Sequence, residues 1–175
     1  MNRKRIKRIV RQLLDEHSVI AGPIDVVYLA KALNIEIRLR DFAKDMSGFA
    51  YQKGGEKVIG VNASDSPLRQ RFTIAHELGH IYLDPRDDLN VDKNFVLKYR
   101  NGLSSQGIDL KEMEANYFAA ELLMPEDLLK EDIEAYKKEY GGFDFEDDEL
   151  VRLLAGKYRV SGHAMSVRLA SLHYL

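Results

Sequence analysis

Hydrophobic residues recur every three or four positions through most of this chain, which predicts a mainly helical protein. Residues 2–16 follow this pattern, with apolar side chains on one face and basic side chains mostly on the other. The same spacing predicts further helices at about residues 25–33, 66–83, 111–124, 126–139, 149–158 and 163–172. Gly, Pro and Asn residues between these segments mark where helices end.

One region between the second and third predicted helices follows the pattern of β-strands. Residues 35–39 alternate apolar and polar side chains. Residues 48–52 and 57–62 flank Lys53-Gly54-Gly55-Glu56, a sequence that favours a hairpin. We therefore expect an α+β fold that is mainly helical, with a small antiparallel sheet directly before the helix at 66–83.

The segment 86–110 is polar and contains Gly102 and Gly107. Within it, only residues 95–99 have the composition of an ordered element. Loops of this length are uncommon inside a compact domain and are often functional. We expect the segment to form a rim or a flap over a functional site.

The last two predicted helices, joined by a short turn at 159–162, have the outline of a helix-turn-helix. Arg168 is the only Arg, Lys, Asp or Glu between residues 163 and 172, so a basic face for reading DNA is not evident. The pattern favours packing or partner docking. We expect residues 1–145 to form the main domain and residues 146–175 to form a helical appendage packed on it.

The amino-acid composition excludes several kinds of site and classes of protein. The 175 residues include no cysteine, which excludes disulfides, thiolate nucleophiles and structural zinc sites built from Cys. The formal net charge of −2 argues against a protein that coats nucleic acid. Basic residues near the start fit the solvated face of a docked helix, and a patch for nucleic acid or an acidic partner is the alternative. No apolar run approaches the ~20 residues of a membrane span, and we expect a cytoplasmic protein.

The candidate chemistry lies in the segment Phe72–Leu83, FTIAHELGHIYL. His76 and His80 are four residues apart, so on a helix they lie one above the other, about 40° apart around the axis. Two imidazoles in this arrangement suit adjacent corners of a tetrahedral Zn²⁺ site. Glu77 lies about 100° further round, where it can reach a water bound to the metal. The motif His-Glu-x-x-His therefore predicts a zinc site with Glu77 as the general base.

A catalytic zinc site of this type needs a third protein ligand, commonly a carboxylate from a later helix. Glu112 and Glu114, in the helix at 111–124, are the two candidates. Glu112 shares a helix face with small alanines that allow close packing against Gly79, which favours Glu112. Asn116 lies one turn further on, where it could hydrogen-bond the outer nitrogen of a ligating histidine.

This ligand set leaves one metal position for water, whose pKa zinc lowers to about 7. Glu77 would accept the proton of that water and pass it to the leaving amine. A further donor to the oxyanion is common in such sites. The sequence leaves the choice open among Tyr82, Tyr117, Tyr158 and His163.

The run RQRFTIAHELGHIYL at 69–83 and the run EMEANYFAAELLMP at 112–125 resemble the ImmA/IrrE family of metallopeptidases. The start IDVVYLAKALNIEI and the end KYRVSGHAMSVRLASL extend the resemblance over nearly the whole chain from about residue 20. The resemblance implies a zincin-like domain in which two histidines and a glutamate hold zinc. The family's glutamate begins an E-x-x-A-(N/D) pattern, which falls on Glu112 and Asn116.

Members of that family typically act as anti-repressors, which cleave or otherwise inactivate a helix-turn-helix transcriptional repressor. We therefore expect a zinc-dependent endopeptidase whose substrate is such a repressor. The alternative is a binding module with a structural or vestigial zinc site, which relieves repression by sequestering its partner. Direct DNA binding through the last two helices is a third hypothesis, and the sequence leaves the oligomeric state open.

Overall fold

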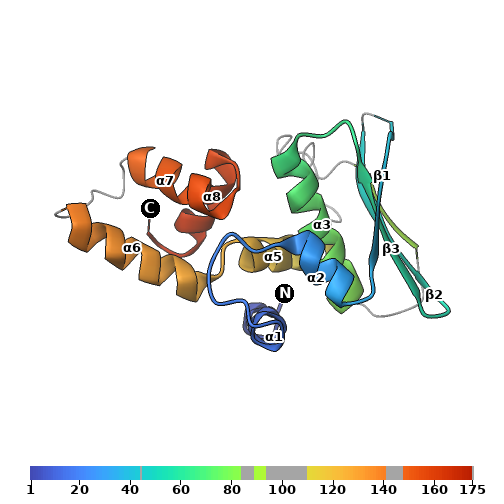
Figure 1. Ribbon diagram of the computed structural model, residues 1–175, viewed down its shortest axis with the longest axis horizontal. Helices are drawn as coiled ribbons and strands as arrows, with labels where there is room; N and C mark the ends of the chain where they lie inside the picture. Colours follow the sequence, from blue (N-terminus) through green and yellow to red (C-terminus); the bar gives the residue numbers. More distant parts are fainter. Residues whose placement is uncertain (44, 84–88, 94–109, 141–147, 175) are drawn as a thin grey trace.

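The computed structural model describes residues 1–43, 45–83, 89–93, 110–140 and 148–174 of the chain. Figure 1 shows a sheet at one end, a group of helices at the other and the helices α3 and α5 between them. The helices α1 and α2 lie near this middle part. The mainly helical α+β fold predicted from the sequence is confirmed.

Helices occupy nearly the positions that the hydrophobic spacing predicts. Their bounds are α1 Arg3–Glu16, α2 Val26–Ala32, α3 Pro67–Leu83, α5 Leu110–Leu123, α6 Glu126–Tyr140, α7 Asp148–Tyr158 and α8 Gly162–Ser171. Capping residues set several of the starts. Asp25 accepts hydrogen bonds from the backbone N–H groups of Val27 and Tyr28, and Ser161 accepts one from Ala164.

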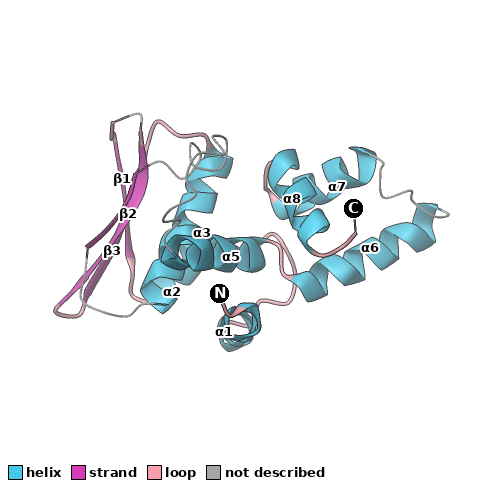
Figure 2. Ribbon diagram, turned by 180° about the vertical axis from the view of Figure 1, so that it is seen from behind, coloured by secondary structure: helices cyan, strands magenta, loops and turns pink. Residues whose placement is uncertain are grey.

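The sheet contains β1 Glu36–Arg40, β2 Met46–Lys53, β3 Glu56–Asn62 and β4 Leu89–Lys93, in the order β1-β3-β2-β4. Strands β2 and β3 form the expected antiparallel hairpin, whose turn residues Gly54 and Gly55 both have positive φ. The expectation that the whole sheet is antiparallel is wrong for β1, which pairs parallel with β3. The hairpin returns β3 into the space beside β1, so the two strands run the same way (Figure 2).

Strand β4 is an element that the sequence pattern did not predict. It pairs antiparallel with β2 and forms one edge of the sheet. Its residues, LNVDK, include Asn and Asp, which are depleted in strands, and so they carry a weak strand signal. The segment 95–99, which the sequence marks as ordered, lies outside the described residues.

Helix α3 is the centre of the fold. Every residue from Thr73 to Ile81 is buried, including His76, Glu77 and His80. One side of the helix packs on β2 and β3 and another on α5. A helix buried on all sides can place polar side chains away from bulk water, and there they need specific partners.

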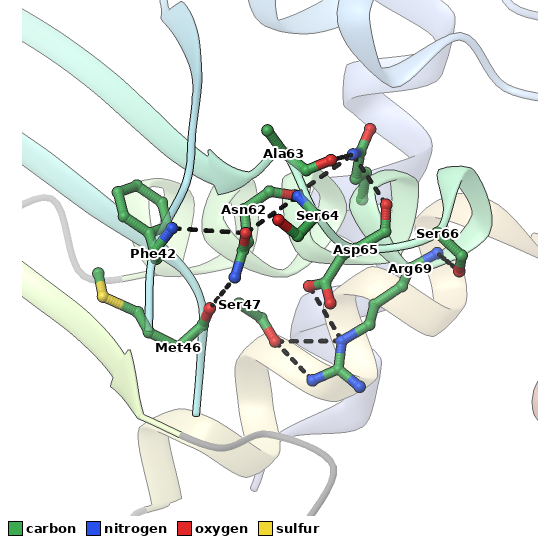
Figure 3. Close-up of polar contacts among 10 residues, drawn as sticks. Phe42, Met46, Ser47, Asn62, Ala63, Ser64, Asp65, Ser66 and Arg69 are labelled. Carbon is green, nitrogen blue, oxygen red and sulfur yellow. Dashed lines mark hydrogen bonds and ion pairs between the residues drawn. The ribbon is translucent and has the colours of Figure 1, made fainter. Parts of the chain in front are cut away.

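A polar network fixes the start of α3 against the sheet, and Figure 3 shows its members. The guanidinium of Arg69 donates to Ser47 Oγ at 2.6 Å and to Asp65 Oδ2 at 3.0 Å. Asn62, the last residue of β3, donates to the carbonyl of Met46 at 2.9 Å. These contacts join β2, β3 and the start of α3. They therefore orient α3, and with it the two histidines further along the helix, relative to the sheet.

The C-terminal helices pack on the rest of the molecule through buried contacts. Arg168 in α8 is 2% exposed, forms an ion pair with Glu121 of α5 and donates to the carbonyl of Met124 at 3.1 Å. The one strongly basic side chain of α8 is therefore directed into the protein. This placement supports the packing role predicted for the helix pair, while the domain division at 145 stays a prediction.

Within the described residues, the structure has no helix that combines the length and the apolar character needed to cross a membrane.

Candidate metal centre

His76 and His80 face each other across one turn of α3. Their Nε2 atoms lie 3.0 Å apart, and the two rings meet edge to face with centroids separated by 4.7 Å. The ring of Phe72, one turn before His76, stacks on the His76 ring at 6.5 Å. This packing fixes the orientation of the His76 imidazole and keeps both Nε2 atoms directed to a common point.

Glu112 supplies a third polar side chain at the same point. Its Oε2 lies 3.3 Å from His76 Nε2, and its Oε1 lies 3.3 Å from His80 Nε2. Hydrogen bonding to His76 and His80 holds the pKa of Glu112 well below its ordinary value, so the group is an anion at neutral pH. Ligand atoms of these three residues lie within 4.8 Å of one another.

Glu114, the alternative third residue, points elsewhere. Its Oε1 accepts a hydrogen bond from the backbone N–H of Asn2 at 3.4 Å, next to the start of α1. The two glutamates are two residues apart on α5, so their side chains leave the helix about 200° apart. The structure thus brings Glu112, and not Glu114, to the two histidines.

Glu77 lies beside this cluster and is fully buried. A Cβ built on Gly48 of β2 would lie 3.5 Å from Glu77 Oε1, so the carboxylate faces the sheet at that strand. The same Cβ would lie 2.4 Å from Thr73 Cγ2 and 2.8 Å from the Gly60 carbonyl, so no side chain fits there. The sequence pattern alone does not single out Gly48, although a glycine inside a strand is a signal of close approach.

Gly79 allows α5 to approach the metal-site helix, as its position in the motif predicts. A Cβ at Gly79 would lie 3.1 Å from Ala115 Cα, 3.2 Å from the Ala115 carbonyl oxygen and 3.2 Å from Phe118 Cβ. Two of these atoms belong to the backbone of α5 and cannot turn aside. The absence of a side chain at Gly79 is therefore what brings Glu112 within reach of the histidines.

We expect Gly79→Ala to destabilise the protein by about 1–3 kcal/mol, the usual range for overpacking a close contact. The substitution raises helix propensity by about 1 kcal/mol, so a loss of stability can only come from the contact with α5. Gly156→Ala in α7 is the matched control, because a Cβ there meets nothing within 4 Å. Urea unfolding of both variants checks this expectation, and a Gly79→Ala variant as stable as Gly156→Ala contradicts it.

The remaining predicted residues are not part of the cluster. Asn116 Oδ1 is buried but has no hydrogen-bond partner among the described residues, so its predicted bond to a ligating histidine stays a prediction. Tyr82 stacks on Phe118 at 6.0 Å, and Tyr158 donates to Asp132 Oδ2 at 2.7 Å. Tyr117 lies under the guanidinium groups of Arg3 and Arg168. These contacts leave the oxyanion donor unassigned.

Comparisons with known proteins show the family to which this chain belongs. A family model described as the IrrE N-terminal-like domain matches residues 30–170. The chain belongs to this family. Its match spans both α3 and α5, the two helices that carry the cluster, and also the C-terminal helix pair. The ImmA/IrrE resemblance of the sequence is thereby confirmed.

Two relatives are similar to this chain in sequence, and one solved structure is similar to it in fold. The radiation response metalloprotease IrrE of Deinococcus radiodurans is 34% identical over 124 residues, which are 70% of this chain and 32% of that protein. An immunity region protein 2 of Bacillus phage phi105 is 30% identical over 121 residues, which are 69% of each chain. A Mycobacterium tuberculosis transcriptional regulator shares the fold at a TM-score of 0.63 and 17% identity, over 95% of this chain and 46% of that one.

The chain thus spans about a third of the Deinococcus relative and less than half of the mycobacterial structure. Family membership and the similarity to the Deinococcus metalloprotease support a domain of metallopeptidase type, and the cluster of His76, His80 and Glu112 is compatible with a metal ion.

Proposed function

We propose that this protein is a zinc-dependent endopeptidase that cleaves a helix-turn-helix transcriptional repressor. The observation that carries the proposal is the convergence of two imidazole nitrogens and one carboxylate at a buried point on α3 and α5. Two histidines and a glutamate are the ligand set of catalytic zinc sites in peptidases. Membership in a metallopeptidase family supports the same chemistry.

The three side chains fit a divalent ion of the size of zinc. Zn–N and Zn–O bonds of about 2.0–2.2 Å place neighbouring ligands of a tetrahedron about 3.3–3.6 Å apart. His76 Nε2 lies 3.0 Å from His80 Nε2, and each of these nitrogens lies 3.3 Å from a different carboxylate oxygen of Glu112. His76, His80 and Glu112 would therefore hold the ion, and they leave a fourth position for water. When bound, the ion supplies a Lewis acid that polarises the scissile carbonyl and makes water more acidic.

The chain's own residues supply the proton transfers. Glu77 follows His76 directly and is the only acidic residue in the Phe72–Leu83 segment. As general base it would take the proton of the attacking water and then donate it to the leaving amine. Glu77 is fully buried, so this proton transfer would take place away from bulk water.

The kind of substrate is supported by the relatives. One of them is an immunity region protein of a phage, and a structural neighbour is a transcriptional regulator. The name of the structural neighbour refers to control of transcription. A repressor of the helix-turn-helix class is the substrate that such a peptidase would inactivate.

A second function, sequestration of the repressor without cleavage, would use the same fold. Arg168 is buried, so α7 and α8 do not present it to DNA, and their exposed surface is available to a protein partner. Under this alternative, the metal site holds the fold together and relief of repression survives the loss of Glu77.

Metal binding is tested by removing one ligand. We expect purified protein to bind about one zinc ion per chain and His80→Ala to bind almost none, because two remaining ligands hold zinc weakly. Zinc at a hundredfold excess over its Kd should stabilise the wild type by about 2.7 kcal/mol and should not stabilise the variant. His163→Ala is the control, since His163 is exposed at the start of α8. Full zinc binding by His80→Ala would contradict the assignment.

The substrate is tested by incubating the zinc-loaded protein with a purified helix-turn-helix repressor and following fragments by mass spectrometry. Cleavage at one peptide bond that disappears in His80→Ala supports the proposal. If the protein binds the repressor and leaves it intact in the presence of zinc, the sequestration alternative replaces it. Comparison of Glu112→Gln with Glu114→Gln in the same assay identifies the third ligand.

A further inference from the structure

Arg71, on α3, is the one arginine among the described residues with two buried guanidinium nitrogens that lack a partner. Its Nε and Nη2 are closed to solvent, and neither donates a hydrogen bond within the part of the chain that the structure describes. Buried polar atoms are nearly always paired with protein, water or an ion. A charged guanidinium makes the lack of a partner more costly still. We therefore expect a hydrogen-bond acceptor to bind beside these two nitrogens.

The two atoms together form one edge of the guanidinium. Nε and Nη2 carry parallel N–H bonds, and this edge binds the two oxygens of a carboxylate or phosphate at once. Arg38 shows the same geometry elsewhere in the chain, where Nε and Nη2 donate to the two carboxylate oxygens of Glu36 at 2.8 Å and 2.7 Å. In Arg71 the equivalent edge is buried and has no acceptor among the residues that the structure describes. The missing group is thus a pair of anionic oxygens.

The charged surroundings of Arg71 also favour an anion. Burial lowers the pKa of Arg71, and the positive charge of Arg159 lowers it further, while Asp25 opposes this effect. Asp25 is already engaged, because its Oδ1 accepts the backbone N–H groups of Val27 and Tyr28. An anion beside Arg71 would offset the repulsion from Arg159 further.

Three segments meet around this position. Arg159 lies in the turn between α7 and α8, where it adopts a left-handed backbone conformation with φ of 53°. The preceding residue, Tyr158, packs its ring against Gly22, where a Cβ would lie only 2.9 Å from the ring. Gly22 belongs to the loop that leads to Asp25 and α2. The turn of the helix pair and this loop are thereby held close together, and α2, which follows the loop, packs on α3.

We propose that Arg71 and Arg159 form a binding site for a small oxyanion, of the sulfate, phosphate or carboxylate type. Arg71 supplies the bidentate edge, and the exposed side chain of Arg159 supplies a second positive charge that can turn towards the ion. The bound anion would join the α7–α8 turn to the helix that carries the metal ligands. The inference stands independently of peptidase activity.

Sulfate is the probe, because it binds zinc weakly and leaves the metal site loaded. Thermal unfolding of the zinc-loaded chain is followed as sodium sulfate replaces sodium chloride at constant ionic strength. We expect the Tm to rise and to saturate, by roughly 3–5 °C at ten times the Kd. A parallel series with sodium acetate tests a carboxylate as the ligand. The anion whose effect on the Tm saturates at the lower concentration represents the preferred ligand class.

Arg71→Lys is the decisive variant, since it keeps the charge and removes the paired N–H edge. We expect it to weaken sulfate binding at least about tenfold, and we expect Arg159→Gln to weaken it as well. Because Arg159 is exposed, we expect Arg159→Gln to fold normally. It therefore tests the site even if Arg71→Lys fails to fold. Arg8→Gln, at an exposed position of α1, should respond to sulfate like the wild type.

Two results overturn the inference. If sulfate raises the Tm of Arg71→Lys and Arg159→Gln as much as that of the wild type, the effect is an adventitious ion only. If neither sulfate nor acetate produces a saturating rise in the wild type, the two nitrogens are satisfied by water.

Discussion

Replacement of Glu77 by Gln is expected to lower the rate of peptide cleavage by about 100- to 10,000-fold, the usual contribution of a general base. Gln has nearly the shape of Glu, so it fills the same buried space against Gly48 of β2. It cannot accept and return a proton at neutral pH. Since Glu77 is not among the three clustered ligand residues, zinc content should stay unchanged. Initial rates and metal analysis on the same preparation measure both quantities.

Glu114→Gln is the matched control for this experiment. It removes a carboxylate from α5 that contacts the start of α1 and not the histidines, so cleavage should continue at the wild-type rate. Equal rates for wild type and Glu77→Gln would remove Glu77 as the base. Relief of repression that survives in Glu77→Gln, without any cleavage, would favour the sequestration alternative.

Arg168→Met is expected to lower the free energy of unfolding by about 3–5 kcal/mol, because it leaves the buried carboxylate of Glu121 without its counter-charge. The side chains of Arg168 and Glu121 are 1% and 4% exposed. Glu121 Oε1 also accepts the backbone N–H of Glu126 at 3.2 Å, so the pair joins α5, α6 and α8. Urea unfolding at pH 7 measures the loss.

Two further variants separate the ion pair from other effects. Arg152→Met breaks a surface pair with Glu149, whose side chains are 73% and 56% exposed, and should cost under about 1 kcal/mol. The double variant Glu121→Met, Arg168→Met should recover part of the loss, since no unpaired charge stays buried. Similar losses for Arg152→Met and Arg168→Met would show that burial of the pair is unimportant to stability.

The sequence was sufficient for the features that depend on local order along the chain. Helical spacing placed α3 within one residue of its observed start, and the two-residue glycine turn placed the hairpin. The four-residue separation of His76 and His80 put both imidazoles on one helix face without any knowledge of the fold. Even the close approach of α5 was foreseeable, because Gly79 and the alanines of α5 leave room for it.

Features that join distant segments needed the tertiary structure. The sequence favoured Glu112 over Glu114 by helix face, but only the packing of α5 on α3 brought its carboxylate 3.3 Å from both histidines. The parallel pairing of β1 with β3 and the addition of β4 beside β2 depend on contacts between segments that are distant in the sequence. A local sequence pattern does not contain this information. Arg168 and Arg71 look like surface residues in the sequence, because charge predicts exposure. Burial of an arginine is decided by what the fold places around it.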